Sequence, residues 1–362
     1  MEEQEKALIA MSGGVDSSVA AYLMQEAGYH CIGATMRLYK NETISLKEEH
    51  TCCSLDDVKD ARNVARQLGI PYHVFNFTDD FETSVIHKFI SSYEAGLTPN
   101  PCVDCNRYMK FGHLLRIAEE LGCSCIVTGH YSRIAYSPER DRWLLYRAAY
   151  REKDQSYVLY NLTQHQLAHT RFPLGELPKE DVRRIAEAQG FLNARKHDSQ
   201  DICFVPDGDY AAFMERYTGK SYPAGDYLDL SGNIVGRHKG AIRYTLGQRK
   251  HLGLAMNQHV YVCAKDMSAN TVTIGPESAL FTRTVWVDDL NWISVPEPVQ
   301  PMRVCAKTRY RQQEQPATVY PEANGKIRVV FDAGQRAVTP GQALVMYDGD
   351  LVVGGGTILA TE

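Results

Sequence analysis

The strongest constraint on the fold is a regular alternation of short apolar runs and longer amphipathic runs between residues 6 and about 205. Strand-length runs such as "KALIAM", "CIGATMRLY" and "PYHVFNF" alternate with helix-length runs, of which Val15–Ala27 and Leu55–Leu68 each end at a glycine. This order predicts a parallel sheet with helices on both faces. Ligands of such sheets bind at the carboxyl ends of the strands. We therefore expect the glycine loop after residue 10, Met36 and the "TGHY" stretch (Thr128–Tyr131) to share one cleft.

After about residue 206 the pattern changes to short β-type runs at roughly 8–12-residue intervals, separated by glycine and proline turns. A chain of 362 residues is long enough for two or three domains. We predict an α/β domain over residues 1–205, followed by two smaller β-rich domains of barrel type over 206–280 and 281–362.

Composition excludes some classes of protein. No run of 18 or more apolar residues is present, so we expect no membrane span, and the acidic start "MEEQEK" is unlike a signal or transit peptide. A cytoplasmic location follows, where ten cysteines are mostly reduced. Ten thiols there favour metal, cluster or redox chemistry over a disulfide scaffold. The net charge of −5 means that any nucleic-acid contact must use local basic patches.

The stretch "SGGVDSS" (Ser12–Ser18) lies between a predicted strand and a predicted helix. Small residues let backbone N–H groups turn inward, and the helix start adds its positive dipole end, so the loop favours a phosphate over an ordinary capped turn. It lacks the lysine that reaches the β- and γ-phosphates in GxxxxGK[ST] loops. This absence favours a grip on pyrophosphate while the α-phosphate is attacked, with Asp16 near a magnesium ion. Here the chain resembles the PP-loop ATP pyrophosphatases, which adenylate an oxygen and expel pyrophosphate.

The cysteines indicate sulfur chemistry. Cys102 and Cys105 form a C-x-x-C that precedes Arg107 and Lys110, and Cys203 follows Lys196 and His197 in the sequence. Nearby cations favour the nucleophilic thiolate. An alternative is a structural zinc half-site completed by Cys52 and Cys53. The other cysteines are interpreted as small hydrophobic residues: Cys31, Cys123, Cys125, Cys263 and Cys305.

Eight motifs in order extend the resemblance to nearly the whole chain: "MSGGVDSSVA", "TPNPC" with "CN" and "KF", "TGHY", "KDQSYVLY", "DSQDICF", "YTLGQRKHLGL", "KTRYRQ" and "VTPGQALV". In these motifs the chain resembles the tRNA-specific 2-thiouridylases. The resemblance implies that sulfur replaces the wobble-uridine 2-oxygen in glutamate, glutamine and lysine tRNAs. It also implies ATP and Mg²⁺, and as partners tRNA and a sulfur-carrier or cysteine-desulfurase relay protein, without a membrane.

The same resemblance implies a mechanism and a set of site residues. ATP adenylates the uracil C2 oxygen, Cys203 carries a persulfide, and Cys105 is the attacking or resolving thiol. A Cys105–Cys203 disulfide closes the cycle and needs reduction. The residues implied to bind ATP are Ala10, Met11, Ser12, Gly13, Gly14, Val15, Asp16, Ser17, Met36 and Gly129. The residues implied to contact the target base or the rest of the tRNA are Asn100, Pro101, Cys102, His130, Lys153, Asp154, Gln155, Arg309, Tyr310 and Gln342.

One departure from the family matters. Many members carry an aspartate, described as an acid/base group, where this chain has Cys102, and the neighbouring Asp104 is a candidate substitute. Cys102, Cys105 and Cys203 could instead ligate a four-iron four-sulfur cluster. The sequence therefore leaves two versions of the chemistry open, a persulfide relay and a cluster-dependent route.

Two other function classes compete with thiolation. An ammonia-using PP-loop ligase predicts no need for Cys105 or Cys203, and a zinc-stabilised RNA-binding module predicts no pyrophosphate release. Basic runs that could contact an RNA backbone include "RYRQ" and "GQRKH". Tyr244 and Tyr310 lie among them as candidate stacking residues. Because the target base must leave its stack, a flipped uridine is expected. We also expect that replacing Arg309 weakens tRNA binding and leaves ATP binding intact.

Overall fold

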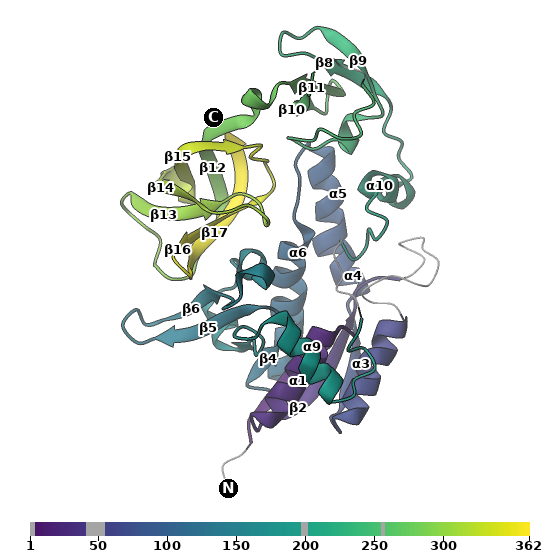
Figure 1. Cartoon of the computed structure of the whole chain (residues 1–362), viewed down its shortest axis with the longest axis vertical. Helices are drawn as coiled ribbons and strands as arrows, with labels where there is room; N and C mark the ends of the chain where they lie inside the picture. Colours follow the sequence, from purple (N-terminus) through teal and green to yellow (C-terminus); the bar gives the residue numbers. More distant parts are fainter. Residues whose placement is uncertain (1–3, 41–54, 197–201, 255–257) are drawn as a thin grey trace.

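The computed structural model describes residues 4–40, 55–196, 202–254 and 258–362. Its first part is a fully parallel five-stranded sheet of order β3-β2-β1-β4-β7. Its strands are β1 (Lys6–Ala10), β2 (His30–Arg37), β3 (Tyr72–Asn76), β4 (Cys125–Val127) and β7 (Thr170–Arg171). Figure 1 shows this sheet in the part of the molecule that holds the N-terminus. The predicted α/β architecture is confirmed.

Alternating side chains of β1 explain why helices cover both faces of the sheet. Leu8 belongs to a core cluster shared with the helical stretches of residues 78–94 and 101–120. Ala7 and Ile9 point to the other cluster, which includes residues of α1, α3 and α9. The helices of the second face are α1 (Val15–Glu26), α3 (Leu55–Gln67) and α9 (Lys179–Ala188). Those of the first are α4 (Thr78–Phe81), η1 (Glu82–Ile86), α5 (His87–Glu94), α6 (Pro101–Asp104), η2 (Cys105–Leu114) and α7 (Leu115–Glu120).

The sequence from 206 onward forms two further β structures, as predicted. Helix α10 (Tyr210–Thr218) precedes a four-stranded sheet of order β10-β11-β8-β9 with its own core. The strands are β8 (Gly225–Leu228), β9 (Ile234–His238), β10 (Tyr261–Asp266) and β11 (Thr271–Gly275). The last six strands close into a barrel through the pairing of β12 with β17. They are β12 (Phe281–Trp292), β13 (Met302–Lys307), β14 (Gln315–Pro321), β15 (Ile327–Arg336), β16 (Ala343–Asp348) and β17 (Leu351–Thr361).

A hairpin of β5 (Ser132–Ser137) and β6 (Arg142–Arg147) joins the first part of the chain to the barrel. β6 pairs with β17 at Tyr146 and Leu351, so this hairpin extends the barrel's sheet. It directly follows the "TGHY" stretch at the end of β4. The connection therefore brings the barrel beside the carboxyl end of the parallel sheet, where a ligand is expected. Within the described ranges, no helix combines the length and apolar composition needed to span a lipid bilayer.

Candidate active site

The glycine loop between β1 and α1 has a conformation that its sequence requires. Gly13 has a φ of +76°, and a Cβ added there would lie 2.4 Å from the backbone oxygen of Asp57. A side chain is therefore disfavoured both by backbone strain and by a clash. Ser17 Oγ donates to Gly14 O at 3.0 Å and accepts from Ser12 N at 3.2 Å. These bonds hold the loop in shape before any nucleotide arrives.

Asp16 lies in the first turn of α1, where its charge suits the helix dipole. Its two carboxylate oxygens accept from Lys179 Nζ at 2.7 and 2.8 Å, and Oδ1 also accepts from the Tyr131 hydroxyl at 2.7 Å. Gly129 permits this approach, because a Cβ there would lie 2.8 Å from the backbone of Asp16. Mg²⁺ is usually held by one or two carboxylates together with substrate phosphates. Asp16 suits that role, and a bound Mg²⁺ would take the place of the Lys179 ammonium at its carboxylate.

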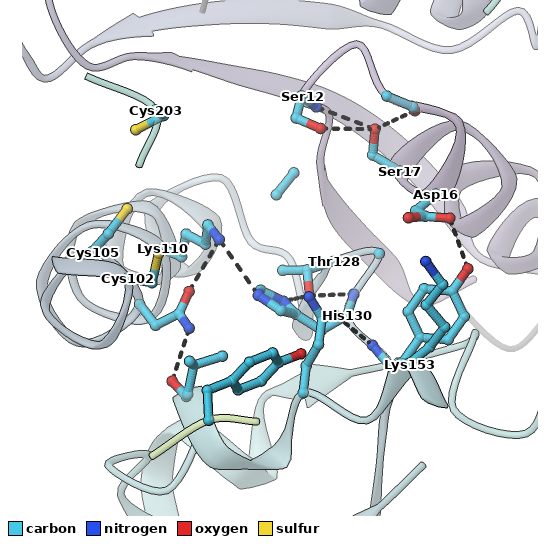
Figure 2. Close-up of a pocket in the computed structure, with 18 of the residues that line it drawn as sticks. Ser12, Asp16, Ser17, Cys102, Cys105, Lys110, Thr128, His130, Lys153 and Cys203 are labelled. Carbon is cyan, nitrogen blue, oxygen red and sulfur yellow. Dashed lines mark hydrogen bonds between the residues drawn. The ribbon is translucent and has the colours of Figure 1, made fainter. Parts of the chain in front are cut away.

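A cavity of about 1480 Å³ opens at the carboxyl ends of the strands. It brings the glycine loop, "TGHY" and the cysteines together, as Figure 2 shows. The predicted residues that line it are Ala10, Met11, Ser12, Gly14, Val15, Asp16, Ser17, Met36, Asn100, Pro101, Cys102, Cys105, Gly129, His130, Lys153, Asp154, Gln155, Cys203 and Tyr310. Three predicted site residues are not among its lining: Gly13, Arg309 and Gln342.

The cysteines reach this cavity from two separate segments. Cys102 is exposed on α6, and Cys105 is partly buried at the start of η2, so the C-x-x-C lies in a helix. Cys203 is also partly buried, and its backbone oxygen accepts from the Tyr39 hydroxyl at 3.1 Å. The next residue, Phe204, packs edge-on against Phe81 and Phe89 in the core. Figure 2 shows Cys105 and Cys203 across the cavity from Asp16.

The described residues do not fit a metal cluster. Among them, no group of three or more His, Cys, Asp or Glu side chains is arranged to hold a metal ion, so Cys102, Cys105 and Cys203 do not form a ligand triad here. Cys52, Cys53 and His197 lie outside the described residues. Asp104 is a poor substitute for the family's acid/base aspartate. It does not line the cavity, and its carboxylate pairs with Lys88 at 2.6 Å.

Three of the remaining cysteines behave as predicted. Cys31, Cys123 and Cys125 are buried, and burial raises the pKa of each thiol, that of Cys31 to about 11. Such thiols stay protonated at neutral pH and are poor nucleophiles. Cys263 and Cys305 are only partly buried.

Some residues that were predicted to contact tRNA form hydrogen bonds within the protein. The Asp154 carboxylate accepts from Ala148 N, Ser156 N and Ser156 Oγ, all within 3.1 Å. Gln155 Oε1 accepts from Tyr131 N at 2.9 Å. By contrast, Tyr310 is 40% exposed at the rim, and its hydroxyl donates to Asp154 O. The loop residues 154 and 155 therefore support the cavity wall, whereas the partly exposed Tyr310 ring contacts Tyr157 and the Lys307 ammonium.

Arg309 and Gln342 lie outside the cavity lining and join separate parts of the chain. Arg309 Nη2 donates to Leu246 O, Ala337 O and Thr339 Oγ1 at 3.0, 2.8 and 2.6 Å. Gln342 Nε2 donates to Thr98 O at 2.8 Å and to Pro99 O at 3.2 Å, directly before Asn100. Both residues thus act within the protein in this structure, and their contact with tRNA stays a prediction.

Several residues of the cavity or its loops were not predicted, because their partners are distant in sequence. Lys179 is 163 residues from Asp16 and only 8% exposed. Arg147 and Lys307 are buried cations of the cavity wall, contributed by β6 and β13. Arg147 pairs with Glu314 at 2.7 Å and stacks over the Tyr347 ring. No local motif marks Lys179 or Arg147, whereas Lys307 begins the "KTRYRQ" motif but was not predicted as a site residue.

Known proteins are similar to this chain over nearly its whole length. Family models match residues 5–207 (tRNA methyl transferase HUP domain), 211–276 (tRNA methyl transferase PRC-barrel domain) and 282–358 (aminomethyltransferase beta-barrel domain). The tRNA-specific 2-thiouridylase MnmA of Acetivibrio thermocellus is 50% identical over 98% of this chain and 99% of its own. That of Lachnoclostridium phytofermentans is 48% identical over the same shares.

Among solved structures, a 4-thiouridine synthetase–RNA complex with bound ATP aligns with 59% of this chain and 50% of its own, at 17% identity and a TM-score of 0.34. The domain models carry a methyl-transferase description, whereas the relatives that span the whole chain are 2-thiouridylases. Full-length similarity of this extent decides the family. The chain belongs to the tRNA-specific 2-thiouridylases.

Proposed function

We propose that this chain catalyses the ATP-dependent replacement of the uridine 2-oxygen by sulfur in tRNA, at the wobble position of lysine, glutamate and glutamine tRNAs. One observation carries the proposal: a phosphate-type loop without the usual lysine and two cysteines from separate segments line the same cavity. A nucleotide activated at its α-phosphate could therefore meet a sulfur nucleophile without leaving the protein. Near full-length similarity to 2-thiouridylases supports the same chemistry.

The chemistry proceeds in balanced steps. The uracil O2 attacks the α-phosphorus of ATP, pyrophosphate leaves with the bonding electrons, and the N3 proton passes to water. The terminal sulfur of a Cys203 persulfide then attacks C2, and the C2–O bond breaks as AMP departs. Finally the Cys105 thiolate attacks the inner sulfur of Cys203. This cleaves the S–S bond of the persulfide and forms a Cys105–Cys203 disulfide, which a dithiol reductant opens. The sulfur stays on C2 as the thiocarbonyl, and N3 takes back a proton from water.

The proposal also covers the ATP and Mg²⁺ contacts, the sulfur-donating partner, the location and the domain boundaries. The ATP contacts are those of the glycine loop, Met36 and Gly129, and Asp16 is the carboxylate proposed for Mg²⁺, which supplies charge neutralisation at the phosphates. A sulfur-carrier or cysteine-desulfurase protein loads Cys203, and the reaction takes place in the cytoplasm. We further propose residues 1–205, 206–280 and 281–362 as the three domains.

The proposal is tested with ATP, a persulfide donor and unmodified tRNA, with pyrophosphate and thiouridine measured separately. We expect Cys105→Ser and Cys203→Ser to abolish thiouridine while pyrophosphate release continues. Cys305→Ser, a partly buried cysteine of the barrel, is the matched control and should be unaffected. Undiminished thiouridine formation by both site variants would contradict the persulfide route, and pyrophosphate release without thiouridine by the wild type would favour an ammonia-using ligase. Iron and acid-labile sulfide are assayed after anaerobic purification, and a strict iron requirement would contradict the persulfide route.

A further inference from the structure

Lys110 shares a helical stretch with Cys105 and points into the same cavity. Residues Cys105–Leu114 form the π-helix η2. In a π-helix each hydrogen bond spans five residues, so Cys105 and Lys110 lie one turn apart on the same side. Both line the cavity, and Lys110 is half-buried there. In Figure 2 its ammonium extends from the cysteine helix toward His130.

The ammonium of Lys110 is held by two neutral acceptors. Its Nζ donates to Asn106 Oδ1 at 3.0 Å and lies 3.4 Å from His130 Nε2. Asn106 is only 2% exposed, and its amide nitrogen donates to Val158 O at 2.9 Å, which fixes the acceptor oxygen toward Lys110. Each partner therefore has a single orientation that suits a donating ammonium.

His130 is neutral in this arrangement. Burial, followed by the nearby Lys110 charge, holds the pKa of His130 well below its usual value. Its Nδ1 lies 2.6 Å from Thr128 Oγ1. With Nε2 accepting from Lys110, the ring proton resides on Nδ1 and points to Thr128. The "TGHY" stretch thus positions Lys110 without neutralising it.

Two other cations of the cavity differ from Lys110 in having a carboxylate partner, whereas Lys307 Nζ donates to the backbone oxygen of Tyr310 at 3.2 Å. Arg147 pairs with Glu314, and Lys196 pairs with Asp57 at 2.6 Å. Among the described residues, the contacts of Lys110 Nζ are Asn106 Oδ1 and His130 Nε2, and it forms no ion pair with a carboxylate. Two of its three N–H groups meet neutral acceptors, and the third is available to the cavity. An uncompensated ammonium in a half-buried site favours an anionic ligand.

We infer that Lys110 is a catalytic residue that contacts the α-phosphate of ATP, and so supplies from across the cavity the cation that the glycine loop lacks. This inference rests on the proposed function. During adenylation the bond from uracil O2 to the α-phosphorus forms as the bond to the β-phosphate oxygen breaks, and Lys110 stabilises the charge on the α-phosphate oxygens. When sulfur attacks C2, the same ammonium stabilises the departing AMP. Lys110 keeps its proton throughout.

The test compares Lys110→Gln with Arg116→Gln. Arg116 lies on α7, which continues the same helical stretch, but it is exposed, so the control removes an equal charge outside the cavity. Removing a single group that stabilises a transition-state charge typically costs about 10²–10³-fold in rate. We expect Lys110→Gln to lower tRNA-dependent pyrophosphate release at saturating ATP about a hundredfold, with ATP and tRNA dissociation constants within threefold of wild type. Arg116→Gln should match wild type.

A second variant separates catalysis from folding. Ethylamine added to Lys110→Ala should restore pyrophosphate release in a concentration-dependent way, which a merely structural loss would not permit. The inference is overturned if Lys110→Gln keeps its rate within threefold, if its loss lies wholly in substrate affinity, or if ethylamine restores nothing. Failure of the proposed function is a different result, because the wild-type protein would then form no thiouridine.

Discussion

Replacing Arg309 by methionine separates two roles that its position allows. Sequence resemblance implies a tRNA contact, whereas the structure shows its Nη2 bonded to three acceptors from two parts of the chain. Leu246 O belongs to the segment after β9, and Ala337 O and Thr339 Oγ1 follow β15 of the barrel. We therefore expect Arg309→Met to loosen the junction between the central unit and the barrel.

The expected loss of stability in Arg309→Met follows from the hydrogen bonds that Nη2 forms. Nη2 carries two hydrogens, and a hydrogen bond to a charged group contributes about 1.5–3 kcal/mol. Thr339 Oγ1 also donates to Ala337 O at 2.9 Å, so that carbonyl keeps one donor after the substitution. The loss of two such hydrogen bonds then lowers the stability by about 3 kcal/mol. This is roughly a hundredfold change in the unfolding equilibrium of the barrel.

The assay is urea unfolding followed by tryptophan fluorescence, since Trp286 and Trp292 both lie in β12. Arg303→Met is the matched control. Its guanidinium pairs bidentately with Asp332 but is exposed, so its loss should leave the unfolding transition close to that of wild type. Titration of each variant with labelled tRNA and with ATP completes the comparison. If Arg309→Met unfolds like wild type yet loses tRNA affinity, the junction argument is wrong and the direct contact stands.

Three further predictions concern the cavity. Gly13→Ala should weaken ATP binding more than tenfold in a nucleotide titration, whereas Gly28→Ala, with a φ of +89° but nothing within 4 Å of its Cβ, should not. Folded His130 stays neutral because burial and Lys110 lower its pKa, so unfolded protein takes up the extra proton as pH falls below about 6.5. Between pH 7.5 and 5.5 the wild type should therefore lose about 1.4 kcal/mol more unfolding free energy than His130→Asn, and equal losses would contradict this. Asp16→Asn should raise the Mg²⁺ concentration that half-saturates pyrophosphate release at least tenfold, and an unchanged Mg²⁺ titration would exclude Asp16 as the ligand.

Much of the fold was predictable because its signals are local. Val15–Ala27 and Leu55–Leu68 were expected as helices and form α1 and α3 within a residue or two. Glycines that end helices and apolar strand-length runs act over a few residues, so they are legible without neighbours. The β5–β6 hairpin is a local pairing that was not predicted, and its attachment to β17 of the barrel depends on residues about 200 positions away.

The candidate site likewise has features that the sequence predicts and features that depend on the tertiary structure. The sequence by itself determined the glycine loop, the C-x-x-C and Cys203, because loop shape and thiol chemistry belong to the residues themselves. Tertiary structure alone decided that Lys179 pairs with Asp16, that Lys110 stays without a carboxylate partner among the described residues, and that Arg309 turns away from the cavity. The physical reason is that the role of a charged side chain depends on which groups surround it. Those surroundings come from strands and helices far apart in the chain, so folding fixes them.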